Sequence, residues 1–169
     1  MVMWIIGLSG AGKTTLSNAI LEKVRLSKNN IVLIDGDLVR EAFGNDLGHS
    51  MHDRKKNAYR ISRMCKFLDA QGIDVICSIL SLFPESREWN RKNIIDYYQV
   101  YIKAPIQDLK HRDYKGLYKK FENGDIKNLA GLDIEFIEPK NSNIIINNNR
   151  KVEDLLAYTD QLSALFDEL

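Results

Sequence analysis

The residues best suited to chemistry form a glycine-rich stretch near the start of the chain, Gly7-Leu8-Ser9-Gly10-Ala11-Gly12-Lys13-Thr14. The stretch fits the pattern G-x-x-x-x-G-K-[ST], in which backbone N–H groups cradle phosphate oxygens. The glycines allow those N–H groups to turn inward, and a following helix points its positive end at the same anion. Lys13 can reach β- and γ-phosphates, and Thr14 can offer its hydroxyl to Mg²⁺. The alternative is a glycine-rich turn that binds nothing.

Two carboxylates follow the next apolar run of the chain. Asp35 and Asp37 are one residue apart at the end of a predicted strand, so their side chains project differently. One can hold Mg²⁺ through its waters while the other orients and deprotonates an attacking hydroxyl. The alternative is that Asp37 only caps the helix that begins after it.

Cationic side chains complete the set of residues that could bind anions. Arg40, Arg54 and Arg60 suit bidentate binding of a phosphate, although for Arg60 we favour a solvated helix face. Four cationic residues surround Gly116 in the stretch 112–120. Such a stretch can close over phosphates as a basic lid and exclude water, or it can be an ordinary charged surface loop.

The elements that position these residues alternate along the chain. Apolar runs predict strands at 1–6, 31–34, 73–78, 97–102 and 144–146, and the placing of apolar residues predicts helices at 15–24, 38–47, 53–71 and 151–168. Residues 85–95 can also be helical, and 105–111 start another helix. Alternation of this kind predicts an α/β fold, a parallel sheet with helices on both faces. We expect a single domain over residues 1–169 with a lid at about 112–139, and we interpret Asn141–Asn149 as a polar surface segment.

Composition restricts the possible partners and compartments. The net charge is +1 over 169 residues, which gives no electrostatic footprint for nucleic acid or an acidic membrane. Cys65 and Cys77 lie in apolar contexts and are predicted to be buried thiols. No apolar run approaches about 18 residues, so no membrane span is expected. These features favour a cytoplasmic protein.

The chain resembles the adenylylsulfate kinases, which use Mg-ATP to phosphorylate the ribose 3′-hydroxyl of adenosine 5′-phosphosulfate. The matching segments run from residue 7 to residue 139 and are Gly7–Thr15, Asp35-Gly36-Asp37, Asp46-Leu47-Gly48, Asp53-Arg54, Asn57, Ser78, Ser81, Arg112-Asp113, Lys115–Lys120, Ile126-Lys127-Asn128 and Gly131. The K-G-L-Y-K-K block and the D-L-G…D-R…N pattern are specific to this family. The resemblance also implies a homodimer.

The resemblance implies a role for each matching position. Catalysis would depend on Asp37 as the base at the 3′-hydroxyl, with Lys13 and Asp35. ATP would be held by Gly7, Ser9, Gly10, Ala11, Gly12, Lys13, Thr14, Thr15 and Arg112, and Mg²⁺ by Thr14 and Asp35. The acceptor nucleotide would contact Arg40, His49, Arg54, Asn57, Ile79, Leu80, Ser81, Lys115 and Leu129. Ser81 matches a position sometimes described as a phosphoserine, an intermediate that direct transfer does not need.

The departures from the family concentrate on the acceptor side. Leu38 and Tyr114 replace an Asn and a Pro, and the segment Ser78–Pro84 lacks an Arg of the family. His49 and Leu129 stand where relatives carry two phenylalanines that sandwich adenine, a loss of about 1–3 kcal/mol of stacking per base.

These losses favour a pyrimidine acceptor, while the donor side is intact. The chain resembles a branch found with bacterial capsule phosphoramidate genes, and we favour that branch's acceptor, cytidine diphosphoramidate. Adenylylsulfate is the alternative. From another class, a non-catalytic nucleotide-binding domain is possible, but the Asp35/Asp37 pair beside a basic lid argues against it.

Overall fold

Five parallel strands form the centre of the molecule, in a computed structural model that describes residues 1–149 and 151–167. The strand order is β2-β3-β1-β4-β5, and every pairing is parallel. The strands are β1 (Val2–Ile6), β2 (Ile31–Asp35), β3 (Asp74–Ile79), β4 (Tyr97–Lys103) and β5 (Ile144–Asn147). All five predicted strands are confirmed within one or two residues.

The central strand β1 explains why helices cover both faces of the sheet. Its residues are all buried, and their side chains alternate between two apolar clusters. Met3 and Ile5 pack on the side of α1 (Lys13–Val24), while Trp4 and Ile6 pack on the side of α3 (Met51–Asp69). Alternation that is apolar on both sides is typical of a central parallel strand. The predicted parallel sheet with helices on both faces is confirmed.

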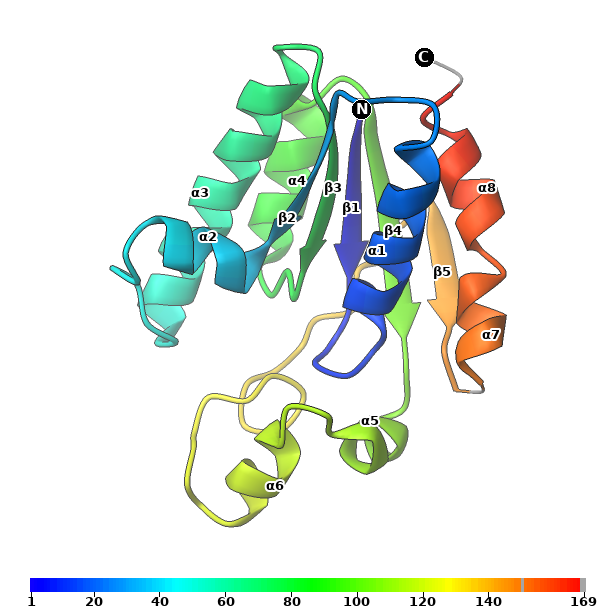
Figure 1. Ribbon diagram of the computed structural model, residues 1–169. Helices are drawn as coiled ribbons and strands as arrows, with labels where there is room; N and C mark the ends of the chain where they lie inside the picture. Colours follow the sequence, from blue (N-terminus) through cyan, green and yellow to red (C-terminus); the bar gives the residue numbers. More distant parts are fainter. Residues whose placement is uncertain (150, 168–169) are drawn as a thin grey trace.

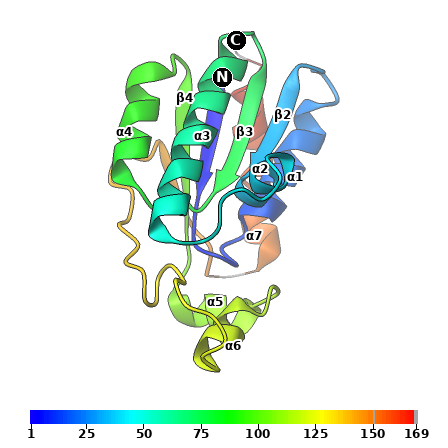
Figure 2. The same cartoon turned by 90° about the vertical axis from the view of Figure 1, so that its left-hand side faces the viewer.

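The other helices that cover the two faces of the sheet lie beside these two (Figures 1 and 2). On one face, α7 (Val152–Leu156) and α8 (Thr159–Ala164) pack against α1; on the other, α4 (Pro84–Asn93) packs against α3. Cys65 and Cys77 are free thiols buried in the α3 side of the core, as predicted, and burial raises the pKa of Cys77.

Three short helices lie at the carboxyl ends of the strands. They are α2 (Gly36–Ala42), α5 (Ile106–Arg112) and α6 (Leu117–Glu122). Figures 1 and 2 both show α5 and α6 below the sheet, beyond the tip of β1, while the N-terminus lies at the opposite end of the strands. The predicted lid segment therefore projects over the edge where the glycine-rich loop lies.

Two predicted helices have different bounds in the structure. The helix expected at 38–47 begins at Gly36, because Asp35 caps it, and ends at Ala42, before Gly44 and Asn45 turn the backbone left-handed. The single helix expected at 151–168 is two helices, since the backbone turns at Ala157 and Tyr158. Leu162 and Phe166, which follow that turn, are fully buried in the core.

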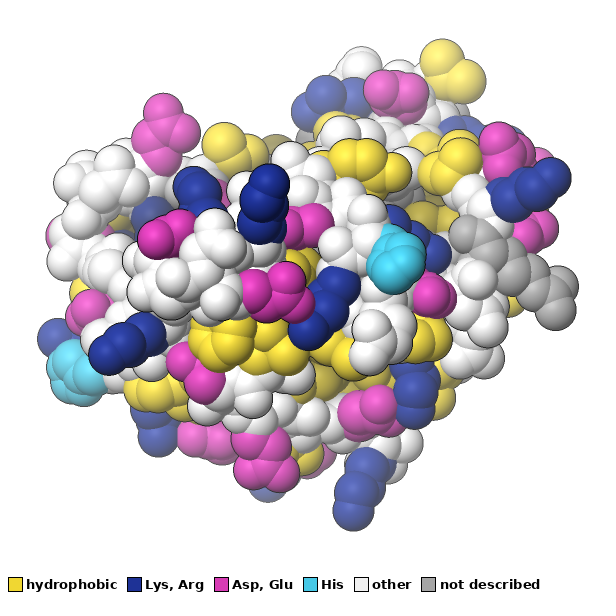
Figure 3. Space-filling view, turned by 90° about the horizontal axis from the view of Figure 1, so that it is seen from below, with side chains coloured by type: hydrophobic (Ala, Val, Ile, Leu, Met, Phe, Trp, Pro, Cys, Tyr) yellow, Lys and Arg dark blue, Asp and Glu magenta, His cyan; other side chains and the backbone are white. Residues whose placement is uncertain are grey.

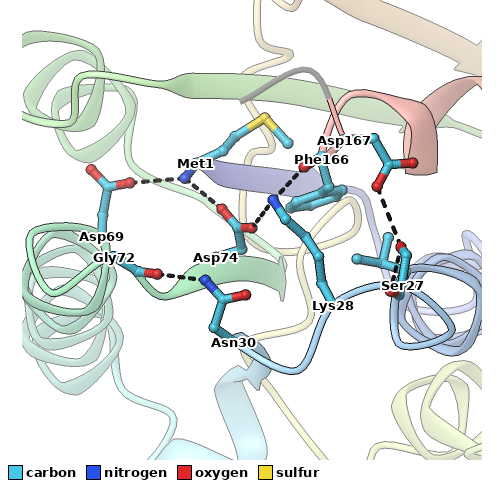
Figure 4. A network of polar contacts seen from close by, with 10 residues as sticks. Met1, Ser27, Lys28, Asn30, Asp69, Gly72, Asp74, Phe166 and Asp167 are labelled. Carbon is cyan, nitrogen blue, oxygen red and sulfur yellow. Dashed lines mark hydrogen bonds and ion pairs between the residues drawn. The ribbon is translucent and has the colours of Figure 1, made fainter.

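A polar network closes the edge of the sheet far from the lid (Figure 4). The Met1 amino group lies 2.8 Å from Asp74 and 3.1 Å from Asp69, and Lys28 Nζ lies 2.9 Å from Asp74. Lys28 also donates to the carbonyl of Phe166, which connects the segment after α1 to the segment after α8. Among the described residues, no helix combines the length and apolarity needed to span a membrane.

Candidate active site

The glycine-rich loop connects β1 to α1 and has the backbone that phosphate binding requires. Gly10 and Gly12 have φ angles of 78° and 98°, in the left-handed region that glycine tolerates. At Gly12 a Cβ atom would lie 2.6 Å from Leu155 Cδ2 and 2.9 Å from Asn148 Nδ2, so no larger residue fits there. Gly12 also stands directly before α1, whose N-terminal N–H groups therefore face the loop.

Lys13 lies in the first turn of α1 and folds back over the loop. Its ammonium group donates to the Leu8 carbonyl at 3.0 Å. The side chain as a whole is half-buried, but loss of water around the ammonium lowers its pKa to about 8, against the opposing pull of Asp35 and Asp37. These influences place both carboxylates near the lysine that would hold the β- and γ-phosphates.

The two carboxylates have different environments, as their spacing predicted. Asp35 Oδ1 accepts a hydrogen bond of 2.8 Å from the backbone N–H of Asp37, so Asp35 is the cap of α2. The alternative in which Asp37 caps this helix is wrong. The Asp37 side chain is 65% exposed and lies 3.3 Å from Arg40 Nη1 and 3.4 Å from Lys115 Nζ. Asp37 therefore presents an exposed carboxylate, flanked by two cations, where a hydroxyl could approach.

A magnesium site would have to be built from few protein groups. The described residues contain no group of three His, Cys, Asp or Glu side chains that could hold a metal ion. Thr14 offers an exposed hydroxyl and Asp35 a half-buried carboxylate, both hard oxygen donors. This fits Mg²⁺, which proteins bind through one or two such groups together with substrate phosphates.

Cationic and amide side chains gather on the acceptor side, around the start of α3. Asn57 Nδ2 and Arg40 Nη1 both donate to the Gly36 carbonyl, at 3.4 and 3.1 Å. Arg40 Nε and Asn57 Oδ1 are buried and have no hydrogen-bond partner among the described residues. Burial together with Arg40 and Arg54 lowers the pKa of His49, so these side chains lie close to one another. The structure thus brings together Asp37, Arg40, His49, Arg54 and Asn57.

The predicted acceptor-binding residues at the end of β3 and directly after it have side chains that are buried or half-buried in the protein. Ser81 has a left-handed φ of 54° and is 6% exposed, and its hydroxyl accepts a hydrogen bond of 3.1 Å from Trp4 Nε1. Arg87 is buried behind it and donates to the Ser81 carbonyl at 2.8 Å. Ile79 is buried, and Leu80 is half-buried beside it.

Leu129 is also turned inward, although the resemblance gives it a place against the acceptor base. It is 8% exposed and belongs to the apolar cluster on the α1 side of the sheet. Its backbone N–H donates to Asp133 Oδ1 at 2.6 Å, which fixes the turn that carries it. As the structure stands, Leu129 offers little surface to a base.

The lid segment, residues 112–139, contacts both sides of the site. Lys115 reaches Asp37, and Arg54 Nη2 donates to the Asn128 carbonyl at 3.0 Å. The sequence did not predict α6 within the lid, which forms because Asp113 accepts from the N–H groups of Tyr118 and Lys119. Tyr118 is fully buried, so the lid base is packed rather than an ordinary charged loop.

One further outcome corrects the sequence analysis, and a second agrees with it. Asn148, placed in a polar surface segment, is 6% exposed and donates to the Ala11 carbonyl at 2.9 Å, while Arg112 donates to the carbonyl of Asn148. Arg60, predicted on a solvated helix face rather than in the acceptor site, forms two hydrogen bonds to the exposed Asp46 at 2.8 and 2.6 Å, which agrees with that prediction. No local pattern marks Asn148, because its partner is 137 residues away.

The surface at this end of the molecule is chemically mixed. Figure 3, which views it from below, shows basic and acidic side chains interspersed around a central hydrophobic patch. A cavity of about 620 Å³ lies beside Leu8, between β4 and the returning lid, and contains none of the predicted catalytic residues. The predicted catalytic residues Lys13, Asp35 and Asp37 therefore lie outside this cavity.

Comparisons with known proteins agree with this geometry. The family model described as adenylylsulphate kinase matches residues 1–147. A cytidine diphosphoramidate kinase of Campylobacter jejuni subsp. jejuni is 40% identical over 151 residues, covering 88% of this chain and 86% of that protein. An adenylyl-sulfate kinase of Picosynechococcus sp. is 36% identical over 144 residues, covering 85% and 81%.

A solved structure gives the same result. The APS kinase of Mycobacterium tuberculosis, in complex with AMPPNP and APS, matches with a TM-score of 0.88 at 30% identity, covering 98% of this chain and 96% of that one. The relatives are kinases of small nucleotides, so the predicted nucleotide kinase activity and the resemblance are both confirmed. With most of its length matched by the family model, the chain belongs to the adenylylsulphate kinase family.

Proposed function

We propose that this nucleotide kinase transfers the γ-phosphoryl group of Mg-ATP to the ribose 3′-hydroxyl of cytidine diphosphoramidate. The observation that carries the proposal is the acceptor side itself. It keeps the anion-binding side chains Arg40 and Arg54, but it has an imidazole and a buried isobutyl group at the two places where relatives stack adenine. The 40% identity to a cytidine diphosphoramidate kinase supports the same acceptor.

The residues divide the reaction between them. The loop N–H groups and Lys13 would bind the donor phosphates, and Arg112 would lie over the nucleotide at the lid. Thr14 and Asp35 would hold Mg²⁺, which neutralises charge on the phosphates. Asp37 would accept the proton of the 3′-hydroxyl, and Arg40, Arg54 and Asn57 would orient the acceptor. Lys115, held near Asp37, would bring the lid down over both substrates.

A second acceptor, adenylylsulfate, has support of its own. Relatives at 36% and 38% identity are adenylyl-sulfate kinases, and the M. tuberculosis structure contains APS. Under this alternative His49 and Leu129 are tolerated replacements in a sulfate-assimilation kinase. We also infer a cytoplasmic location, one domain over residues 1–169 and a homodimer, none of which the acceptor choice requires.

Steady-state kinetics with both acceptors at saturating Mg-ATP test the proposal. We expect kcat/KM for cytidine diphosphoramidate to exceed that for adenylylsulfate by at least about tenfold, or 1.4 kcal/mol. The double variant His49→Phe/Leu129→Phe should narrow the gap by improving the adenosine acceptor. The control is His52→Phe, which adds an exposed ring nearby at a position outside the predicted site. A wild-type preference for adenylylsulfate would refute the proposed acceptor.

A further inference from the structure

Two side chains from distant parts of the chain hold carbonyl groups of the phosphate loop. Tyr118 Oη, in the lid helix α6, donates to the Ser9 carbonyl at 2.9 Å. Asn148 Nδ2, directly after β5, donates to the Ala11 carbonyl at 2.9 Å. They lie 109 and 137 residues from the carbonyls that they hold. The loop is therefore fixed from outside at alternate peptide groups.

Holding a carbonyl also fixes the N–H group of the next residue. A trans peptide is planar, and its C=O and N–H point in opposite directions. The hydrogen bonds at Ser9 and Ala11 therefore set the directions of the Gly10 and Gly12 N–H groups. Neither of these N–H groups donates to a protein acceptor within the described residues. Both remain free for phosphate oxygens.

The loop needs such anchors because its glycines do not fix it. Gly10 and Gly12 adopt positive φ angles but lack the side-chain restraint that would keep the flanking peptides from rotating. Without a donor on the Ser9 carbonyl, the Ser9–Gly10 peptide can turn its oxygen toward the phosphates. An oxygen in that place repels the anion that the N–H group attracts.

We propose that Tyr118 and Asn148 are positioning residues for the donor phosphates, and that Tyr118 couples the lid to the phosphate loop. This inference rests on the proposed donor role of the loop. It assigns to the lid helix a second task besides covering the substrates: α6 helps to shape the loop that binds them.

The surroundings of both residues suit a fixed anchor. Tyr118 is 1% exposed, and burial raises its pKa to about 12, so the phenol remains a hydrogen-bond donor over the physiological range. Asp113 holds the N–H of Tyr118 at 3.1 Å, which fixes the start of α6. Asn148 donates its N–H to the Lys103 carbonyl at 2.8 Å and accepts from Arg112 Nη2 at 2.9 Å. Both anchors therefore connect the loop to the first residues of the lid segment, Tyr118 directly and Asn148 through Arg112.

Tyr118→Phe is the most direct test, because it removes the hydroxyl and keeps the buried ring. The matched control is Tyr97→Phe, which removes a hydroxyl that donates to Gln99 at 2.9 Å within β4, away from the loop. Binding is measured by calorimetry with ATP, with inorganic tripolyphosphate and with the acceptor alone. Tripolyphosphate has no base or ribose, so it reports on the phosphate loop by itself.

We expect Tyr118→Phe to weaken both ATP and tripolyphosphate binding by at least about fivefold, the effect of one neutral hydrogen bond. Acceptor binding should stay within about twofold, and Tyr97→Phe should leave all three constants unchanged. If Tyr118→Phe binds tripolyphosphate as the wild type does, or if Tyr97→Phe weakens it equally, the inference is wrong.

A second pair of variants covers the case in which Tyr118→Phe does not fold. Asn148→Ala should weaken tripolyphosphate binding, whereas Asn143→Ala, which loses an acceptor for the Gln99 N–H, should not. Equal constants for Asn148→Ala and the wild type would overturn the inference. A wild-type protein that binds neither ATP nor tripolyphosphate would instead refute the donor role, and with it the proposed function.

Discussion

Among the residues that would bind ATP, Lys13 is the one whose pKa is lowered by its surroundings, to about 8. Replacing it by Ala removes the cation from the β- and γ-phosphates, and we expect kcat to fall at least about a hundredfold, or 2.7 kcal/mol. The measurement is the initial rate of ADP formation with acceptor present. Retention of more than about a tenth of wild-type activity would contradict the phosphate-loop interpretation.

The lowered pKa of Lys13 adds a pH dependence to ATP binding. Its value of about 8 means that the nucleotide-free enzyme carries the lysine charge below this pH and loses it above. We therefore expect the Kd for ATP to rise between about pH 7 and pH 9.5, because binding must then restore the proton. Lys13→Met binds more weakly but has no group to titrate, so its profile should be flat over the same range.

Asp37 belongs to the acceptor side and should affect turnover alone. If it is the base at the 3′-hydroxyl, Asp37→Asn should reduce kcat by about 10²–10⁴-fold. Its contacts are with Arg40 and Lys115 rather than with the loop, so the Kd for ATP should change little. Single-turnover rates and ATP titrations separate the two effects. A variant with near-normal kcat would leave Asp37 only its ion pairs with the lid and α2.

Single residues could be predicted where their interaction partners are close in the sequence, and were missed where those partners are far away in it. The phosphate loop is a contiguous pattern with a required strand before it and a helix after it, so its residues could be named from the sequence. Asn148 and Tyr118 could not, because their partners in the loop are more than a hundred residues away. Which of Asp35 and Asp37 caps α2 depends on one local hydrogen bond, from the Asp37 N–H to Asp35 Oδ1, that the sequence does not reveal.

Among the strands and helices, the sequence predicted most of those that pack against the sheet. The five strands and the helices α1, α3, α4 and α5 were placed within about two residues. The strands, α1 and α3 bury apolar side chains at regular spacing, whereas α4 buries the polar side chains of Ser86, Arg87 and Asn90. The lid helix α6 was missed, since its one fully buried side chain, Tyr118, stands among charged residues. The break between α7 and α8 was missed because no proline or glycine marks it.

The contact between α3 and the lid leads to a prediction about substrate binding. Arg54 joins these elements, since Nε donates to the His49 carbonyl at 2.9 Å and Nη2 donates to the Asn128 carbonyl at 3.0 Å. A lysine has one ammonium group and cannot reproduce this fork. Arg54→Lys should therefore raise the acceptor KM by about tenfold, or 1.4 kcal/mol, with little change in the KM for ATP.

Arg60→Lys is the matched control for this prediction. Arg60 lies on the same helix and also forms two hydrogen bonds, but both go to Asp46 outside the acceptor cluster. Its substitution should leave both KM values unchanged. An equal rise in the acceptor KM for the two variants would mean that α3 is merely disturbed. An unchanged acceptor KM in Arg54→Lys would remove Arg54 from the acceptor site.

In the molecule as a whole, the candidate active site and a stabilising polar network lie at opposite ends of the strands of one sheet. The carboxyl ends of the strands bear the loop and the lid, while the network around Asp74 closes the other edge (Figure 4). Asp74→Asn leaves Lys28 without its carboxylate partner and leaves the Met1 amino group with Asp69 alone. We expect a loss of about 1–2 kcal/mol in the free energy of unfolding, measured by urea denaturation. The values of kcat and KM should not change, and a fall in kcat would show that the two edges are coupled.

The Met1 amino group should make this stabilisation depend on pH in a chain that carries it free. Burial alone would lower its pKa, but hydrogen bonds with Asp74 and Asp69 outweigh burial, and the pKa is raised above its ordinary 8.0. A group with a raised pKa in the folded state stabilises fully below its unfolded pKa, and the effect is lost as the pH rises through the folded pKa. The difference in Tm between the wild type and Asp74→Asn should therefore be largest near about pH 7 and should narrow toward about pH 10. A smaller difference should remain there from the pair between Lys28 and Asp74. Thermal denaturation of both proteins across this pH range measures the difference in Tm. A difference that does not change with pH would show that the Met1 amino group contributes nothing to it.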